Sequence, residues 1–427
     1  MGDDRMLDGV SVLTLGCKVN RTDSDAISDQ VERLGGRLVQ PEDAAVVIIN
    51  SCTVTAEADA KCRKLISRLE RMPHRPQVIV TGCMAAVADA VLPRATGRVI
   101  VSPERATAAA LAVNHLAAGN ASTAVAAVRP GLRHRVSVKV QDGCDARCSY
   151  CIVPDARGGP RSVPADEVTA RVRELHERGV KEVVLTGINI GRYRWRGLGL
   201  ASLLEQVTST GVTRVRLSSV EPLDIDDALL ATLASTPAVS PHLHIPLQSG
   251  SDAVLKTMNR RYRAADYARI IREARSALPG AAITTDVIAG HPGETDVDAE
   301  ATVRLCEELG LARLHVFRYS QRPNTPAAAM PQVDPRVRDS RARSLRELDT
   351  RLRRSHALRR VGGRADVLIE RADAETASGT TEDYLQATLA GDTDLAPGEM
   401  VTVEITGTTD SGGVIATRAT TAGDGPR

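Results

Sequence analysis

Short apolar runs that alternate with helical patterns constrain the fold of this 427-residue chain more than any other feature. Near the start, two helix-like stretches, about Asp23–Leu34 and Ala56–Met72, separate three β-branched runs of strand length. These runs are Val10–Leu15, Ala44–Ile49 and Val78–Thr81. Strands that alternate with helices form βαβ units, so an open parallel α/β domain is expected. The chain is long enough for two or three domains.

The alternation continues from Val136 to Ala357 through six further strand-like runs. They are Val136–Val140, Glu182–Thr186, Arg214–Ser218, His242–Leu247, Ala282–Ile288 and Arg313–Val316. Helical patterns separate the runs, among them Pro164–Glu177, Ala264–Leu278 and Asp296–Leu309. Six βα repeats predict a partial parallel (βα)6 barrel, in which functional groups lie on the loops that follow the strands.

Beyond about Gly362, short strands separated by Gly, Asp and Thr turns predict a small antiparallel β-barrel, a shape that often binds oligonucleotides. Its expected strands are Ala365–Glu370, Tyr384–Leu389, Met400–Ile405 and Val414–Thr417. The arginine-rich helix Arg336–Arg360 precedes it and is either a solvated connecting helix or a contact for RNA phosphates. The α/β chain is therefore predicted to divide into domains at 1–125, 130–358 and 360–422.

Three cysteines follow the first barrel strand in a C-x-x-x-C-x-x-C array: Cys144, Cys148 and Cys151, with Tyr150 just before the last. Three thiolates this close can hold three irons of a 4Fe–4S cluster and leave the fourth iron open to a small molecule. The spacing differs from that of ferredoxins and zinc ribbons. A zinc site or three unrelated thiols is the alternative, but no nearby Cys or His completes a closed site.

A second set of cysteines is scattered in the sequence. Cys17, Cys52 and Cys83 each stand one to three residues beyond one of the first three strand-like runs. Because the carboxyl ends of parallel strands share one edge of a sheet, the fold is expected to gather these thiols into a second three-thiolate site. The alternative is three buried core thiols. Cys62 and Cys306 fit neither set and are interpreted as packing residues.

Bulk composition limits the location and the partners of the chain. Its net charge of +2 excludes a nucleic-acid binder that is strongly basic throughout. The polar, acidic start lacks the layout of a signal peptide, and the apolar runs are too short to cross a bilayer. A cytoplasmic protein with no membrane partner is expected, in a reducing compartment where cysteines serve as metal ligands rather than disulfides.

These segments, in this order, resemble the methylthiotransferases, a radical S-adenosylmethionine (radical SAM) family, over nearly the whole chain. Gly16–Asn20 and Asn50–Thr55 resemble the cluster motifs of that family's amino-terminal domain. The string His244–Ser251, with Met258–Arg260, is similar to a specific barrel motif, and the last segment resembles the RNA-binding TRAM domain. The residues after the first two cysteines are most similar to the branch that acts on N(6)-threonylcarbamoyladenosine in tRNA.

The resemblance implies two 4Fe–4S clusters and S-adenosylmethionine. The cluster on Cys144, Cys148 and Cys151 would cleave S-adenosylmethionine to a 5′-deoxyadenosyl radical. The second set of cysteines would hold the cluster that delivers a methylthio group to carbon 2 of the adenine, beside the anticodon. The implied partners are tRNA, an electron donor of flavodoxin or ferredoxin type, and a sulfur source. The expected contacts to S-adenosylmethionine are Tyr150, Arg157, Thr186, Gly187, Ser219, Glu221, Gln248 and Gly290.

Other functions stay open at this stage. The neighbouring branches act on isopentenyladenosine in tRNA and on an aspartate of a ribosomal protein, and a non-enzymatic electron carrier would also use two clusters. Two positions depart from the family pattern. Asp155 stands where an aromatic or apolar residue is frequent, and His291 stands where Phe is common, so either can alter substrate choice or the packing of S-adenosylmethionine. Removing the residues after Arg360 is expected to weaken tRNA binding and to spare cleavage of S-adenosylmethionine.

Overall fold

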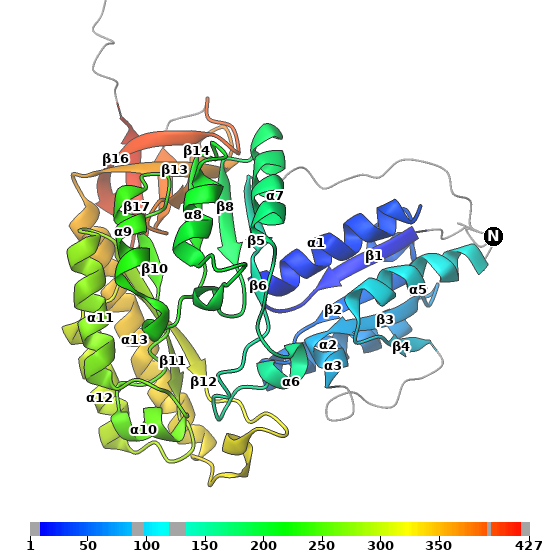
Figure 1. The fold of residues 1–427 in the computed structure, drawn as a ribbon, viewed down its shortest axis with the longest axis horizontal. Coiled ribbons are helices and arrows are strands. Elements are labelled where there is room, and N and C mark those ends of the chain that lie inside the picture. Colours follow the sequence, from blue (N-terminus) through cyan, green and yellow to red (C-terminus); the bar gives the residue numbers. More distant parts are fainter. Residues whose placement is uncertain (1–8, 88–97, 119–133, 391–393, 420–427) are drawn as a thin grey trace, which may run out of the picture. The chain divides into compact units, whose positions relative to one another are not determined.

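A computed structural model describes residues 9–87, 98–118, 134–390 and 394–419 (Figure 1). Packing divides the chain into two units. The first unit comprises the described residues of Met1–Leu132 together with Asp142–Pro160 and Ser320–Ala328; the second comprises those of Arg133–Gln141, Arg161–Tyr319 and Ala329–Arg427. The loop that carries the C-x-x-x-C-x-x-C array therefore belongs with the amino-terminal residues. The expected domain boundaries at 125, 130 and 422 lie outside the described residues, and the three-domain division stays a prediction.

The first unit contains a parallel four-stranded sheet in the order β1-β2-β3-β4. Its strands are β1 (Gly9–Thr14), β2 (Ala44–Ser51), β3 (Gln77–Gly82) and β4 (Val99–Val101). The helices of this unit are α1 (Lys18–Arg33), α2 (Ala56–Glu70), α3 (Cys83–Ala86), α5 (Arg105–Ala118) and α6 (Val153–Arg157). The predicted parallel sheet is confirmed. Neither β4 nor α5 was predicted, because β4 has three residues and α5 is an alanine-rich helix with little contrast between its faces.

The second unit contains six parallel strands in two three-stranded sheets, β5-β8-β9 and β10-β11-β12. Parallel bridges Val215–Val239 and Ser219–His244 continue the pairing from β9 toward β10, which confirms the partial (βα)6 barrel. The strands are β5 (Arg135–Lys139), β8 (Glu182–Thr186), β9 (Arg214–Leu217), β10 (His242–His244), β11 (Ala282–Ala289) and β12 (Arg313–Arg318). β10 is shorter than predicted, because Pro246 has no N–H to donate to a ladder.

Helices cover the barrel strands, and a large apolar core lies between them. They are α7 (Ala165–Glu177), α8 (Leu200–Thr208), α9 (Asp227–Ser235), α10 (Asp252–Thr257), α11 (Ala264–Ala277), α12 (Asp296–Glu308) and α13 (Pro335–Arg360). Helix α13 packs along β11 and β12 and buries Leu345, Leu348 and Leu352, whereas Leu358 is exposed. In the part of the chain that the structure describes, every helix falls short of the length or the hydropathy that spanning a bilayer requires.

Short elements complete the topology. The two-residue strands are β6 (Gln141–Asp142) and β7 (Arg161–Ser162), and the 3-10 turns are Pro41–Asp43, Ile190–Arg192, Pro222–Asp224 and Pro326–Ala329.

The carboxy-terminal strands close into a five-stranded barrel in the order β13-β14-β15-β17-β16, as expected for a small β-barrel. They are β13 (Arg364–Ala372), β14 (Thr376–Thr381), β15 (Gln386–Ala390), β16 (Met400–Thr408) and β17 (Val414–Arg418). The pairing is antiparallel except between β15 and β17, and β14 escaped prediction because it is mostly Thr, Ser and Gly.

Candidate functional site

The three cysteines that are scattered in the sequence follow three adjacent parallel strands and therefore lie at one edge of the first sheet. Cys17 follows β1 by three residues, and Cys52 and Cys83 come directly after β2 and β3. The register is continuous at this edge, since Thr14 lies opposite Asn50 in the β1–β2 pair. The order β1-β2-β3 therefore brings together three thiols that are 66 residues apart from first to last in the sequence.

Two glycines make the close approach at this edge possible. Gly16 has a φ of +105°, and a Cβ atom added to it would lie 2.5 Å from the Cβ atom of Cys52. Gly82 has a φ of +87°, and an added Cβ would lie 2.4 Å from Oδ1 of Asn50. Only glycine combines this backbone conformation with the missing side-chain volume. The glycines that precede Cys17 and Cys83 are thus steric requirements of their turns.

The cysteines also stand where helices begin. Cys17 is the N-cap of α1 and Cys83 is the first residue of α3. After Cys52, the Thr55 side chain accepts a hydrogen bond of 3.2 Å from the Ala58 N–H and so starts α2. Amide groups at the start of a helix carry partial positive charge, which suits the negative charge of a metal-bound sulfur.

Burial disfavours the charged form of two of these thiols. Burial raises the pKa of Cys52 to about 11, and the neighbouring Cys83 and Cys17 act in the same direction. Burial also raises the pKa of Cys83, against the opposing charges of Arg157 and Arg105. Such thiols keep their protons until a metal displaces them. Within the described residues, no three His, Cys, Asp or Glu side chains lie close enough together to bind one metal ion. A 4Fe–4S cluster does not require this, because each thiolate binds a different iron.

The loop with the other three cysteines is closed upon itself by backbone contacts. The Cys144 N–H donates to the carbonyl of Gly158 over 3.0 Å, and a Cβ on Gly143 would lie 2.0 Å from a backbone oxygen of the same Gly-Gly turn. Arg147 adopts a left-handed φ of 50°, and the Ala146 N–H points at the sulfur of Cys144 over 3.4 Å. The loop thus presents its thiols from a tightly curved backbone, with Cys148 buried and Cys151 half-buried.

Arg157, one of the residues expected to contact the cofactor, lies against the first sheet's cysteines. Its Nε donates to the sulfur of Cys83 over 3.2 Å, and its Nη2 donates to Oδ1 of Asn20 and, over 3.0 Å, to Asp23. Its Nη1 donates to Asp142, just before the C-x-x-x-C-x-x-C loop, over 2.8 Å. The side chain is only 1% exposed. A guanidinium with donors on three nitrogens can hold all of these groups at once.

The segment Ser320–Ala328 joins the two cysteine motifs within the first unit. Arg322 forms a buried ion pair of 2.6 Å with Asp59 in α2, close after Cys52. At the other end, the Ala327 N–H donates to the carbonyl of Ser149 over 2.9 Å, inside the C-x-x-x-C-x-x-C loop. Sequence reasoning missed Arg322 and Asp59, as it missed Asp23 and Asp142. Asn20 and Asn50 were at least visible as polar residues in the cysteine motifs.

The other residues expected at S-adenosylmethionine divide between the two units. Tyr150 belongs to the first unit. At the ends of the barrel strands or just beyond them, in the second unit, stand Thr186, Gly187, Ser219, Glu221, Gln248 and Gly290. Glu221 is paired with Arg260 of the Met258–Arg260 motif, and Gln248 has a left-handed φ of 68°. These barrel residues gather at the edge where a βα barrel carries its active groups.

The two departures from the family pattern have different environments. Asp155 is exposed on α6, where its charge meets water. His291 is fully buried, with its ring 5.5 Å from that of Tyr319, and burial lowers its pKa to about 4. The imidazole is therefore neutral in the folded chain, and its Nδ1 lies 3.0 Å from the carbonyl oxygen of Pro292, a contact that a phenylalanine ring could not make.

Two family models match the chain. Residues 138–306 match the radical SAM superfamily, and residues 9–101 match an uncharacterized protein family, UPF0004. A threonylcarbamoyladenosine tRNA methylthiotransferase MtaB from Thermotoga maritima is 37% identical, over 75% of this chain and 77% of its own. The Bacillus subtilis protein of the same name is 35% identical over 93% of both chains. A tRNA-2-methylthio-N(6)-dimethylallyladenosine synthase from Mycolicibacterium smegmatis is 36% identical, over 97% of this chain and 88% of its own.

A solved structure is similar in fold. The radical S-adenosylmethionine methyltransferase TsrM from Kitasatospora setae, with cobalamin and a 4Fe–4S cluster bound, matches with a TM-score of 0.54 and 16% identity. The match covers 76% of this chain and 77% of that one. At this identity the likeness shows a shared fold and carries no statement about substrate.

Proposed function

The chain belongs to the methylthiotransferase family of radical SAM enzymes, and from that premise we propose that it inserts a methylthio group at carbon 2 of N(6)-threonylcarbamoyladenosine beside the anticodon of tRNA. The names of several similar proteins support this substrate, as do the residues that follow Cys17 and Cys52. The gathering of three cysteines at one sheet edge, in the same packing unit as the C-x-x-x-C-x-x-C loop, is the observation that carries the proposal.

The chemistry explains why a cofactor is required. Carbon 2 of an adenine carries an unactivated C–H bond, and no side-chain base has a useful driving force for removing that hydrogen. The cofactor therefore supplies the reactive species, and the protein supplies position and exclusion of water. S-adenosylmethionine and a 4Fe–4S cluster belong to this enzyme class, and when bound they supply a 5′-deoxyadenosyl radical from reductive cleavage of S-adenosylmethionine.

We assign a separate task to each set of cysteines. Cys144, Cys148 and Cys151 would hold the cluster that binds S-adenosylmethionine at its open iron. A second 4Fe–4S cluster would be held by Cys17, Cys52 and Cys83, the cysteines that follow β1, β2 and β3. Gly16 and Gly82 let these turns pack closely against Cys52 and Asn50, and Arg157 donates a hydrogen bond to the Cys83 sulfur.

A pair of cysteine variants tests this division. Cys148→Ala should abolish formation of 5′-deoxyadenosine, because the cluster that binds S-adenosylmethionine loses a ligand. Cys52→Ala should keep that cleavage and stop sulfur insertion. The two products, 5′-deoxyadenosine and the methylthio nucleoside, are measured by mass spectrometry after anaerobic reconstitution. Loss of both products in both variants would contradict separate tasks.

The substrate itself is tested in cells. Mass spectrometry of tRNA nucleosides from a deletion strain should show loss of the 2-methylthio form of N(6)-threonylcarbamoyladenosine and its return with the wild-type gene. A second candidate is the dimethylallyl nucleoside, which the 36% identity to the Mycolicibacterium protein favours. Loss of the methylthio-dimethylallyl nucleoside would select that candidate. Unchanged tRNA with an unmodified ribosomal-protein aspartate would select the protein-modifying branch.

The remaining partners follow from the same chemistry. We propose a cytoplasmic enzyme that receives electrons from a small flavodoxin or ferredoxin, because reductive cleavage consumes an electron. A sulfur source must supply the sulfur atom of each methylthio group. If anaerobic protein supplied with S-adenosylmethionine and a reductant yields no 5′-deoxyadenosine at all, the chain would instead be an electron carrier.

A further inference from the structure

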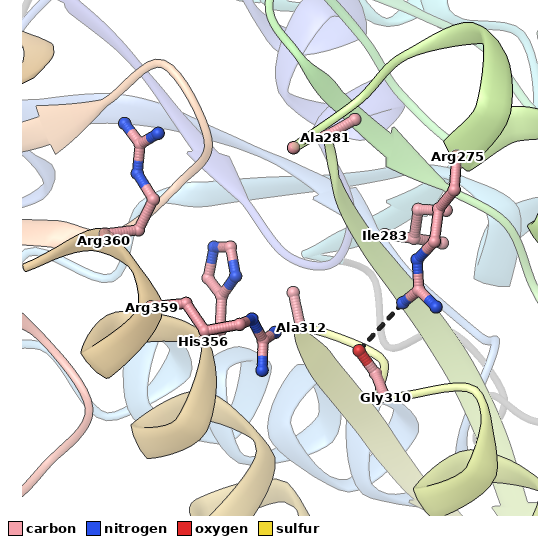
Figure 2. A pocket seen from close by; sticks show the side chains of 9 residues that line it. Arg275, Ala281, Ile283, Gly310, Ala312, His356, Arg359 and Arg360 are labelled. Atoms are coloured by element: carbon pink, nitrogen blue, oxygen red, sulfur yellow. Dashed lines mark hydrogen bonds between the residues drawn. The ribbon is translucent and has the colours of Figure 1, made fainter. Parts of the chain in front are cut away.

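A cavity of about 470 Å³ lies at the amino-terminal end of the barrel strands in the second unit, remote from the edge where the expected cofactor contacts gather. Its floor is formed by small or apolar positions at the starts of β11 and β12, including Ile283 and Ala312. Its walls carry basic side chains from two helices, as Figure 2 shows: Arg275 of α11 on one side, and His356, Arg359 and Arg360 of α13 on the other.

Two of these guanidinium groups have no acidic partner within the described residues. Arg275 donates to the carbonyl of Gly310 over 2.9 Å, and Arg359 donates to Oγ of Ser355 over 2.9 Å. The pKa of Arg275 is lowered by its burial and by the charge of Arg359, so the two like charges repel each other. An anion placed between them would relieve that repulsion and accept hydrogen bonds from both.

The other two basic groups, Arg360 and His356, already have carboxylate partners. Arg360 pairs with Glu382 over 2.7 Å and with Asp383 over 3.2 Å, and His356 contacts Asp383 over 3.0 Å. These carboxylates hold Arg360 and His356 in place and offset the charge of Arg360. The cavity therefore keeps the uncompensated positive charge of Arg275 and Arg359. The carbonyl groups at the carboxy-terminal end of α13 carry a partial negative charge that repels an anion. This charge is small compared with the two full positive charges of the arginines.

Helix α13 connects this cavity with the catalytic edge of the barrel. Near its start, Arg341 pairs with Glu294 over 2.9 Å, in the loop that follows β11. Its 26 residues span about 39 Å, on the order of eleven base steps of a nucleic-acid duplex. The helix carries ten arginines and three acidic residues, so its field attracts a polyanion.

We propose that this cavity binds a backbone phosphate of the RNA substrate, with Arg275 and Arg359 as its ligands. The proposal rests on the proposed function for the identity of the RNA. A phosphate seated here fixes the RNA along α13 while the modified base lies at the far end of the helix. The contact positions the RNA without reading its sequence.

Salt-dependent tRNA binding by the full chain tests the site, with fluorescence anisotropy as the readout. Arg275→Gln and Arg359→Gln should each weaken binding about tenfold at low salt and reduce the slope of log K against log salt by about 0.9. Arg269→Gln is the matched control, because Arg269 lies on the same helix as Arg275 but outside the cavity and is paired with Glu273. Arg359 is exposed, so its variant keeps the test valid if Arg275→Gln folds poorly.

Competition with inorganic phosphate at constant ionic strength separates the two possible sources of the anion. Phosphate should displace tRNA from the wild type more effectively than from Arg275→Gln. Equal tRNA affinity and salt slope in all variants would overturn the site. Saturable phosphate binding that Arg275→Gln abolishes, with tRNA affinity unchanged, would assign the cavity to a free phosphate compound and overturn the RNA contact. If a deletion strain has unaltered tRNA nucleosides, the proposed reaction is wrong. The binding measurements alone decide whether the cavity contacts RNA.

Discussion

A single buried guanidinium ties together the parts of the first unit that carry the cysteines. Arg157 reaches the Cys83 sulfur, Asp23 in α1 and Asp142 before the C-x-x-x-C-x-x-C loop. Because hydrogen bonds to cysteine sulfurs help to set the reduction potential of an iron–sulfur cluster, this residue is placed to tune the second cluster that we propose on Cys83.

Arg157→Gln should lower the reduction potential of that cluster. Loss of a charge-assisted hydrogen bond of roughly 1.5 kcal/mol corresponds to about 60 mV for one electron. The potential is read by electron paramagnetic resonance in a Cys148→Ala background, where only the cluster on Cys17, Cys52 and Cys83 remains. Arg322→Gln is the control, since Arg322 is also buried but its hydrogen bonds among the described residues go to Asp59 and the carbonyl of Thr53 rather than to a thiol. Equal shifts in both variants would argue for a merely structural role.

His291 predicts a pH dependence of stability. Its pKa is about 4 in the folded chain and about 6.5 when exposed, so the unfolded state binds more protons between these values. The stability associated with the neutral ring is complete above pH 6.5 and is lost as the pH falls toward 4, by about 3 kcal/mol.

His291→Phe should remove this component, because the phenylalanine ring has no proton to bind. Urea unfolding of both proteins at pH 7 and pH 4.5 is the measurement, and the difference between them isolates His291 from other titrating groups. Parallel losses of stability in the two proteins would show that the buried imidazole is not responsible.

At the level of elements, charged residues at the starts of the barrel strands form a buried network. Glu182 of β8 accepts from Arg216 over 2.7 Å and from Arg214 over 3.2 Å, and it also pairs with Arg135. Burial acts to raise the pKa of Glu182, but the hydrogen bond and charge of Arg216, with the other arginines, hold it below its usual value. Polar residues at these strand starts thus serve packing rather than chemistry.

Glu182→Gln should destabilise the chain by about 3–5 kcal/mol, because it leaves buried guanidinium groups without their counter-charge. Chemical denaturation measures the loss. Glu174→Gln is the matched control: Glu174 also pairs with two arginines, Arg171 and Arg178, but it is 49% exposed and should cost less than about 1 kcal/mol. A loss for Glu182→Gln as small as that of the control would contradict the network.

At the scale of the whole molecule, the small β-barrel is part of the second unit rather than a detachable tail. Arg216 donates to the carbonyls of Glu382 and Thr381 over 2.8 and 2.7 Å, and its guanidinium lies 3.9 Å from the ring centre of Tyr384. Arg214 donates to the carbonyl of Asp366 over 2.9 Å. Arg216 is fully buried by these contacts.

A chain that ends at Arg360 should therefore lose stability as well as RNA binding, in contrast to the expectation from sequence that cleavage of S-adenosylmethionine is spared. Removing the acceptors of a buried guanidinium costs several kcal/mol, which corresponds to a fall in Tm of about 10 °C. Differential scanning calorimetry checks this, with a chain ending at Ala419, after the last strand, as the control. If the Tm of the shorter chain is unchanged, the β-barrel does not stabilise the rest of the second unit.

Local patterns in the sequence were sufficient for most of the fold and for the candidate ligands. Short apolar runs that alternate with helical patterns gave the parallel sheet and the six barrel strands, and helical periodicity gave α13, which buries one regular face. Cysteine spacing and the strand ends predicted both ligand sets, because each rests on residues near in sequence or on a rule of sheet topology. β4 was missed because it has only three residues, and β14 was missed because it is mostly Thr, Ser and Gly.

Only the tertiary structure decided which distant side chains meet. Arg157 contacts Cys83 across 74 residues, Arg322 contacts Asp59 across 263, and Arg216 reaches the carbonyl of Glu382 across 166. Because arginine is charged, residue type alone predicts a surface position for all three, yet each is buried in the fold. A buried charge is stable only beside the partners that neutralise it, and those partners come together only when the chain has folded.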